Sequence, residues 1–213
     1  MKTKEINAIQ DMDRVKRLNL INSISGISPA NLVGTISNDL TENLAIISSV
    51  VNIGSNPPLI GFILRPTKKT RRDTYENILN TGFYTINHIN NDIVQKAHYS
   101  SVKFDKNISE FNKLNLNEQY IDDFYAPFLK ESYVKVGMKF KEEINIKANG
   151  TKLIVVQIVQ LSIPDIAISK EGYVNLEILN SVGIGGLNSY YTLKLKEQHP
   201  FARVENLPNF NAS

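Results

Sequence analysis

The chain has 213 residues, of which 42% are hydrophobic, and a formal net charge of +3 at pH 7. This composition supports a packed core and argues against disorder, and the near-neutral charge argues against nucleic-acid binding. No cysteine is present, which excludes disulfides and thiolate ligands, and the three histidines show no metal-ligand spacing. The N-terminus lacks the apolar core of a signal peptide, and no apolar run is long enough to span a bilayer. We therefore expect a cytoplasmic protein with no membrane contact and no metal.

The predicted elements begin after an N-terminal segment of about 25 residues that shows no decisive pattern. Runs rich in Ile, Val and aromatic residues then predict strands. These runs cover residues 31–37, 44–52, 58–65, 83–89, 133–147, 152–163 and 190–196. Asn149 and Gly150, between the two longest runs, are typical of a two-residue type I′ turn and predict a hairpin.

Three short stretches, at residues 73–82, 90–100 and 109–116, show helical signals. In the first, Asp73 is the expected N-cap, Glu76 follows three residues later, and Gly82 is the expected end. Thr70 together with Asp73 is an alternative start. Many strands with few helices predict a mainly β fold, either a barrel or a sandwich.

We expect a single domain over residues 1–213, with a core of about residues 20–195 between an N-terminal segment and a C-terminal tail. The tail has no periodicity but keeps four apolar residues. It is expected to lie across a partner subunit or the chain's own barrel, or to fray. The four residues are Phe201, Val204, Leu207 and Phe210.

A dense basic run follows the strand expected at residues 58–65, immediately before the helix that starts near Asp73. Its members are Arg65, Lys68, Lys69, Arg71 and Arg72. A helix N-terminus offers free N–H groups and a positive dipole end, and arginine offers paired donors that match phosphate. The position therefore predicts a phosphate site, to which Thr74 adds a hydroxyl. A solvated basic loop is the alternative, and the Asp73 carboxylate is a point against a phosphate.

Small residues close the apolar run that precedes the basic loop. Ser48 and Ser49 follow Leu44–Ile47, and small side chains let a flat ligand approach the backbone. Pro57 and Pro58 then enforce a tight connection to the next strand, so that the small residues and the basic end lie side by side. No P-loop and no dinucleotide-binding glycine motif is present. A flat ring with one phosphate suits FMN, whereas a strand end facing solvent is the alternative.

The order of these elements resembles the flavin reductase-like proteins, the FMN-binding split β-barrel family. The resemblance rests on "NLVGTIS", "NLAIISSVVNIGSNPPLIGFILRP" and "DTYENILNTGFYTINHI", and it extends over roughly residues 20–195. It implies a split barrel of Greek-key type that forms a homodimer, with FMN near the interface. It also implies hydride transfer from NAD(P)H to flavin, in many members to supply a partner monooxygenase. FAD is an alternative to FMN.

The resemblance also assigns residues to the two ends of the cofactor. The residues beside the ring, mainly through their main chain, are Ile46, Ile47, Ser48, Ser49 and Val50, with Ser37 at the far edge. Those at the phosphate are Arg65 and Thr74, with Lys69, Arg71 and Arg72 as further candidates. Asn31 could meet the ring or serve as a turn residue.

The sequence leaves the catalytic residues open, since the cofactor carries the hydride chemistry. His98 is a weak candidate for contact with the flavin or the nicotinamide, or for proton transfer, and an ordinary helix-end histidine is the alternative. His88 is expected to be structural. The competing functions are an FMN-dependent oxidoreductase acting on another substrate, and a flavin-binding or electron-transfer protein without NAD(P)H activity. A nucleic-acid binder is disfavoured by the charge.

Overall fold

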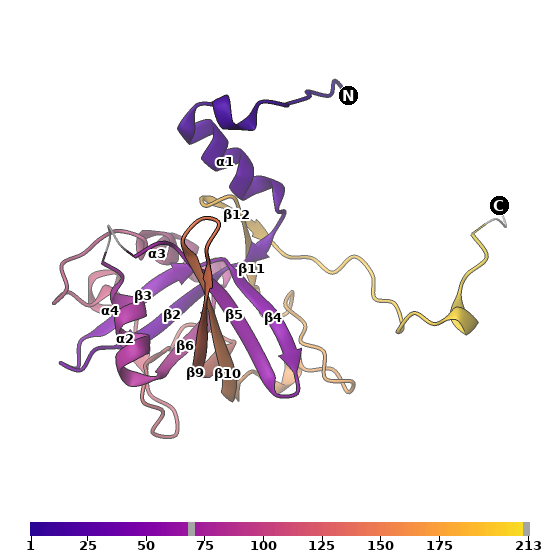
Figure 1. The fold of residues 1–213 in the computed structure, drawn as a ribbon. Helices are drawn as coiled ribbons and strands as arrows, with labels where there is room; N and C mark the ends of the chain where they lie inside the picture. The colour runs from indigo at the N-terminus through magenta and orange to yellow at the C-terminus, as the bar shows by residue number, and fades with distance from the viewer. Residues whose placement is uncertain (68–70, 211–213) are drawn as a thin grey trace.

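A computed structural model describes residues 1–67 and 71–210 of the chain. It is built around a seven-stranded sheet in which every neighbouring pair is antiparallel, in the order β3-β2-β6-β9-β10-β5-β4 (Figure 1). The strands are β2 (Asn31–Ile36), β3 (Glu42–Ile47), β4 (Val50–Ser55), β5 (Pro58–Leu64), β6 (Phe83–His88), β9 (Lys135–Ile146) and β10 (Thr151–Ser162).

The sheet closes on itself with a split between its two outer strands. β3 and β4 stand at opposite ends of the strand order, yet only Ser48 and Ser49 separate them in the chain. The three peptide steps from Ile47 to Val50 can span at most about 11 Å. The sheet must therefore curl until β3 and β4 come together, although no described residues of these two strands pair with each other. The result is the mainly β split barrel expected from the sequence.

Alternate residues of the strands face two separate hydrophobic clusters. On β2, Val33 belongs to an inner core and Leu32 to an outer core. The inner core fills the barrel and includes Phe62, Tyr84, Ile86, Met138, Ile154 and Val156, with Ile78 of a covering helix. The outer core lies against the other face of β2 and β3 and includes Leu44, Ile89, Ile93, Phe111 and Leu129. This alternation is the two-residue period of a strand with both faces covered.

Short helices cover the barrel, close to where the sequence predicts them. They are α2 (Asp73–Thr81), α3 (Val94–Tyr99) after a 3₁₀ turn (Asn91–Ile93), and α4 (Glu110–Lys113). Gly82 ends α2 in the left-handed conformation, with φ of 74°, and donates its N–H to the Ile78 carbonyl. That conformation is the reason for glycine at this position.

Smaller elements complete the chain. A three-stranded sheet joins β1 (Ser28–Pro29), β11 (Val182–Gly185) and β12 (Ser189–Thr192), and a two-stranded sheet pairs β7 (Glu118–Gln119) with β8 (Phe128–Leu129). Three further 3₁₀ turns are Ile9–Asp11, Asp165–Ala167 and Val204–Asn206.

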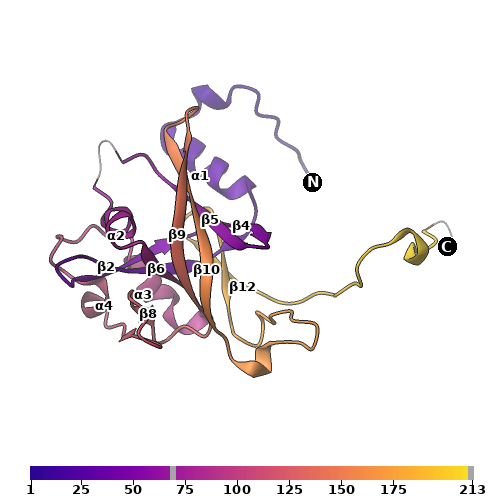
Figure 2. The ribbon, with the colours of Figure 1, turned by 60° about the horizontal axis from the view of Figure 1, so that its bottom comes forward.

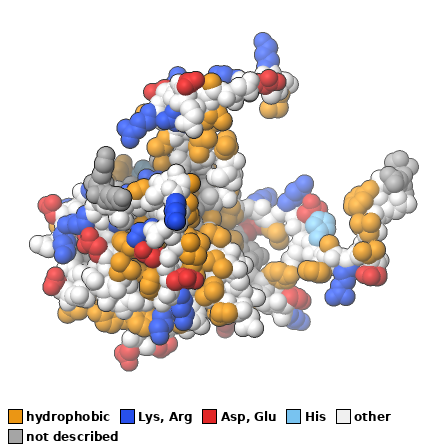
Figure 3. Space-filling model, viewed as in Figure 1, with side chains coloured by type: hydrophobic (Ala, Val, Ile, Leu, Met, Phe, Trp, Pro, Cys, Tyr) orange, Lys and Arg blue, Asp and Glu red, His pale blue; other side chains and the backbone are white. Residues whose placement is uncertain are grey.

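Both ends of the chain project from the body (Figures 1 and 2). Helix α1 (Arg14–Ile24) is capped by the Asp13 side chain, which accepts the N–H groups of Val15 and Lys16, and it has no buried residue. The C-terminal tail leaves a different side of the body from α1 and carries strongly exposed apolar side chains. Figure 3 shows hydrophobic side chains along both arms. No helix in the described part of the chain is long and apolar enough to cross a membrane.

Four details differ from the sequence-based expectation. The run at 44–52 is two strands, because the chain changes sheet edge at Ser48 and Ser49. The prediction of a two-residue type I′ turn is wrong. Residues 147–150 form a longer loop, in which Gly150 alone has a positive φ, of 74°. Helix α2 starts one residue earlier than expected, with Arg72 rather than Asp73 at the N-cap. The last predicted strand is only four residues long. The alternative start at Thr70 lies outside the described residues.

Candidate functional site

The junction between β3 and β4 is a half-buried strip of small and aliphatic residues. Each residue from Ile46 to Val50 is partly exposed, so the strip is open to a ligand. The Ser49 hydroxyl donates to the Ile63 carbonyl and accepts the Ile63 N–H, both at 3.1 Å, which fixes the junction to β5. The Ser48 hydroxyl has no hydrogen-bond partner among the described residues. Ser49 is therefore structural, and Ser48 is the hydroxyl of the pair that can meet a ligand.

The basic loop starts beside this junction. Ile63, which holds Ser49, lies two residues before Arg65, and two strand residues span about 7 Å. Arg65 is exposed at the point where β5 ends. The small-residue strip and the first cation of the loop therefore lie side by side, as the sequence predicts.

The far end of the loop leads into an α2 start that carries no side-chain cap. The Asp73 carboxylate turns to Arg71 instead, with 2.8 Å to Nε and a hydrogen bond of 3.0 Å from Nη2. Arg72, at the N-cap, keeps a buried Nε atom without a hydrogen-bond partner in the described part of the chain. Asp73 thus does not block the helix N-terminus, and Arg72 keeps donor capacity. Lys68 and Lys69 lie outside the described residues.

The Thr74 hydroxyl is already engaged in a buried network. It donates to Asn43 Oδ1 at 2.9 Å, and that oxygen also accepts the Thr35 hydroxyl at 3.2 Å. The other end of the Asn43 amide donates to Glu110 Oε2 at 3.0 Å, and the N–H of Leu44 donates to the same oxygen at 3.0 Å. Since its proton is committed to Asn43, Thr74 offers an anion its backbone N–H and not its hydroxyl proton.

Glu110 anchors this network from α4. Only 8% of the residue is exposed, and burial raises the pKa of its carboxyl although the donors from Leu44 and Asn43 act in the opposite direction. These four hydrogen bonds therefore join α4, β2, β3 and the first turn of α2. Such a chain fixes where α2 begins.

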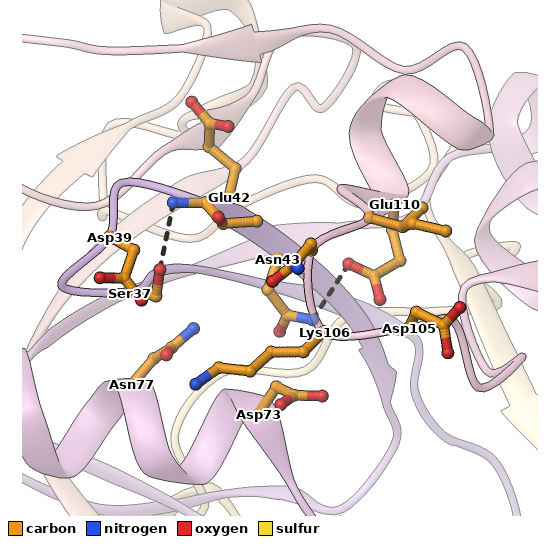
Figure 4. A pocket seen from close by; sticks show the side chains of 12 residues that line it. Ser37, Asp39, Glu42, Asn43, Asp73, Asn77, Asp105, Lys106 and Glu110 are labelled. Atoms are coloured by element: carbon orange, nitrogen blue, oxygen red, sulfur yellow. Dashed lines mark hydrogen bonds between the residues drawn. The ribbon is translucent and has the colours of Figure 1, made fainter.

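A small acidic pocket lies between α2 and the β2–β3 turn (Figure 4). Its cavity of about 20 Å³ is large enough for one water molecule and too small for a flavin ring. Ser37 lines it and accepts the Thr41 N–H at 3.1 Å. The β2–β3 register puts Ser37 past Glu42, about 20 Å from Ile47 along the strand, so the structure does not bring Ser37 to the β3–β4 junction. No group of three or more potential ligands among the described residues could hold a metal.

One polar cluster beside the basic loop is not visible in the sequence. Tyr75 of α2 meets Glu143 and Lys152, which form an ion pair on the β9–β10 hairpin. The hydrogen bonds from Lys152 and Tyr75 lower the pKa of Glu143. The hydrogen bonds of Lys152 to Glu143 and Tyr75 raise the pKa of Lys152. Burial, then the Glu143 hydrogen bond, raises the pKa of Tyr75. Strand register alone brings these distant residues together, so no local sequence motif predicts the cluster.

His98 lies away from the basic loop, on the outer-core side of β3. Its Nδ1 is 3.2 Å from the Tyr190 hydroxyl, and Tyr190 packs against the outer core, as Ile46 does. Burial raises the pKa of Tyr190. The pair joins α3 to β12 and packs on the outer core, against which Ile46 of the predicted ring end also packs.

Asn31 and His88 face each other across β2 and β6 near the same end of β3. Asn31 is 1% exposed, and neither polar atom of its amide has a partner among the described residues. It is therefore a buried strand residue and not the turn residue that the sequence left open. Burial lowers the pKa of His88 to about 4, which keeps the ring neutral and agrees with a structural role.

Comparison with known proteins decides the family. Residues 26–177, more than two thirds of the chain, match the family model for the flavin reductase like domain. The chain belongs to this family. A proposed flavin reductase with a split barrel domain from Shewanella frigidimarina is 41% identical, with a TM-score of 0.87 over 91% of this chain and 96% of that one. An uncharacterised protein of Aquifex aeolicus is 25% identical over 158 residues, which are 73% of this chain and 79% of the relative.

More distant structures share the fold of the flavin reductase like family. Component B of nitrilotriacetate monooxygenase from Bacillus cereus has a TM-score of 0.82 at 17% identity, over 93% of this chain and all of that one. Flavoredoxin of Desulfovibrio vulgaris has a TM-score of 0.71 at 21% identity, over 83% and 92%. The family and the 41% relative support a flavin-related oxidoreductase, and the predicted split-barrel fold is confirmed.

Proposed function

We propose that this protein binds FMN across the β3–β4 junction and the start of α2, and that it reduces the flavin with NAD(P)H. The observation that carries the proposal is the Ser49–Ile63 contact. It sets the open strip at residues 46–50 beside Arg65, so that a flat ring and its phosphate can use neighbouring parts of one surface. The orphaned Arg72 Nε at an uncapped helix start fits the phosphate end.

Each end of the proposed site has a separate task. The main chain of residues 46–50 and the free Ser48 hydroxyl orient the ring, and the aliphatic side chains of Ile47 and Val50 shield one side of it from water. Arg65, Arg72 and the first N–H groups of α2 bind the phosphate. Arg71 neutralises Asp73, which keeps that carboxylate from repelling the phosphate. Lys69 remains a candidate phosphate ligand. When bound, FMN supplies the hydride chemistry.

We further propose that the protein acts as a homodimer and delivers reduced flavin to a partner monooxygenase. The name of the Bacillus cereus structure, a monooxygenase component, supports the second part. FAD in place of FMN, and an oxidoreductase acting on a substrate other than flavin, are the alternatives within the family. The Kd values for FMN and FAD distinguish these two cofactors, because FAD differs from FMN by a second phosphate and an adenosine.

The test is anaerobic reduction of the flavin-loaded protein. We expect purified protein to bind FMN, and NADH or NADPH to bleach the flavin absorbance near its visible maximum. Protein that binds neither FMN nor FAD contradicts the cofactor assignment. Flavin that stays oxidised with both nicotinamides contradicts the reductase assignment and favours a flavin-binding or electron-transfer protein.

The phosphate end is tested by Arg65→Ala. Loss of a charge-assisted hydrogen bond should raise the Kd for FMN about tenfold or more and leave the Kd for riboflavin unchanged. Lys139→Ala is the matched control, because Lys139 lies over the Phe83 ring, just past the C-terminal end of α2. An equal loss for FMN and riboflavin in Arg65→Ala would show that Arg65 does not bind the phosphate.

A further inference from the structure

A closed triangle of side chains ties α2 to the β9–β10 hairpin. The Tyr75 hydroxyl donates to Glu143 Oε2 at 2.5 Å and accepts from Lys152 Nζ at 2.6 Å. Lys152 also donates to Glu143 Oε1 at 2.7 Å, and its ammonium lies 4.8 Å from the centre of the Tyr75 ring. All three side chains are therefore held by both of the others.

The triangle lies where both ends of the basic loop meet the barrel. Lys152 pairs with Leu64 across β10 and β5, and Leu64 directly precedes Arg65. Tyr75 lies in the first turn of α2, three residues after the N-cap Arg72. The loop therefore leaves β5 beside one corner of the triangle and enters α2 beside another. A bond across this point fixes the distance between the two ends of the loop.

The first turn of α2 has a second attachment on its other side. Thr74 bonds to Asn43 of β3, whereas the next residue, Tyr75, bonds to the hairpin. Consecutive residues thus hold the turn to two strands that are not neighbours in the sheet. Without the Tyr75 hydroxyl, the turn keeps its attachment to β3 and loses the one that sets its position relative to β5.

We propose that the Tyr75–Glu143–Lys152 triangle is a positioning device for phosphate recognition. It holds the two ends of the 65–72 loop so that Arg65 and Arg72 converge on one phosphate group. In this proposal Tyr75 and Lys152 act through the ends of the loop rather than as phosphate ligands, and two of the three ammonium donors of Lys152 are engaged by Glu143 and the Tyr75 hydroxyl. The inference rests on the proposed FMN site and adds the residues that set its preference for a phosphorylated flavin.

Tyr75→Phe is the sharpest test, because it removes only the hydroxyl. The ring still packs on the inner core, and the Lys152–Glu143 pair remains. We expect the Kd for FMN to rise about three- to tenfold, the loss typical of one or two hydrogen bonds, while the Kd for riboflavin stays unchanged. Fluorescence titrations at fixed ionic strength measure both. Lys152→Met should act in the same direction, and it replaces Tyr75→Phe as the test if that variant does not fold.

The controls separate a positioning role from a structural one. Lys139→Met removes a lysine from the same hairpin, also placed over an aromatic ring, and should change neither Kd. An equal loss of FMN and riboflavin affinity in Tyr75→Phe, or no loss at all, would overturn the inference. If Tyr75→Phe binds FMN as tightly as the parent while Lys152→Met binds it more weakly, Lys152 is a direct ligand and the positioning role is wrong. A parent protein that binds FMN no better than riboflavin would overturn the proposed phosphate site itself, and the positioning role with it.

Discussion

His88 carries a pH dependence of stability that a single residue can test. Its pKa is about 4 in the folded protein and 6.5 when unperturbed, so the unfolded chain binds a proton between these values that the folded chain does not. The contribution is fully present above pH 6.5 and is lost as the pH falls toward 4, by up to about 3 kcal/mol. Urea unfolding at a series of pH values should show this slope.

The matched variants for this slope are His88→Asn and His199→Asn. The first should flatten the slope between pH 6.5 and 4, and the second should leave it intact, because His199 lies exposed in the tail. Glu143 contributes only at the acid end of this range, since its pKa is lowered below 4.5, and it is unchanged in both variants. A slope that survives in His88→Asn would contradict the assignment.

The sequence shows which residue types the proposed site uses but not how they pair. Arg65 and the two serines are recognisable from composition and position alone. The engagement of Thr74 by Asn43 joins residues 31 positions apart, and that of Tyr75 by Glu143 joins residues 68 apart. Both depend on strand register, which the sequence leaves open. For the same reason the sequence allows Ser37 to lie beside the ring, whereas the structure places it at the other end of the β2–β3 hairpin from the β3–β4 junction.

At the scale of elements, β2 depends on a glycine where another segment approaches closely. A Cβ on Gly34 would lie 2.2 Å from the Pro127 carbonyl oxygen and 2.6 Å from the Thr85 hydroxyl. That hydroxyl donates to the same Pro127 oxygen at 2.6 Å. Gly34→Ala should therefore separate β2 from this segment and lower the free energy of unfolding by about 3 kcal/mol.

Gly54→Ala on β4 is the control for this prediction. A Cβ at Gly54 meets no atom within 4 Å, and its φ is not positive. Chemical denaturation should therefore separate the two variants clearly. Equal midpoints for them would show that the contact at Gly34 relaxes without cost.

The elements that are wrongly predicted from the sequence depend on tertiary structure, which local sequence patterns do not show. The run at 44–52 has no glycine or proline, so periodicity alone cannot show that the chain changes sheet edge at its centre. The expected two-residue hairpin turn fails because Ile146 pairs with Thr151, which leaves four residues in the loop, and strand register is not visible in the local turn signal. Helix α1 buries no residue, so it lacks the amphipathic pattern that sequence reasoning needs.

At the scale of the whole molecule, the exposed apolar side chains of the C-terminal tail support the proposed homodimer. The exposed fractions are 82% for Phe201, 87% for Val204, 71% for Leu207 and 81% for Phe210. Each such side chain gains about 1.5–3 kcal/mol when fully buried. We expect a dimer in sedimentation equilibrium, and removal of residues 194–213 should weaken it by at least about tenfold.

Ile166→Ser is the control for the tail, because Ile166 is 79% exposed on a 3₁₀ turn of the body. It should leave the dimer unchanged. A monomeric full-length chain would contradict the homodimer. A truncated chain that associates as strongly as the full one would show that the tail has no part in the interface.

The split in the barrel has a consequence for handling the protein without its cofactor. β3 and β4 are both outermost strands, and unpaired backbone groups on such strands can recruit strands of other molecules. Val51 and Ile53 add exposed apolar side chains on β4. In the proposed complex the flavin covers the junction of these two edges, as a further strand would. Loss of the cofactor is therefore expected to uncover both strand edges and to favour aggregation.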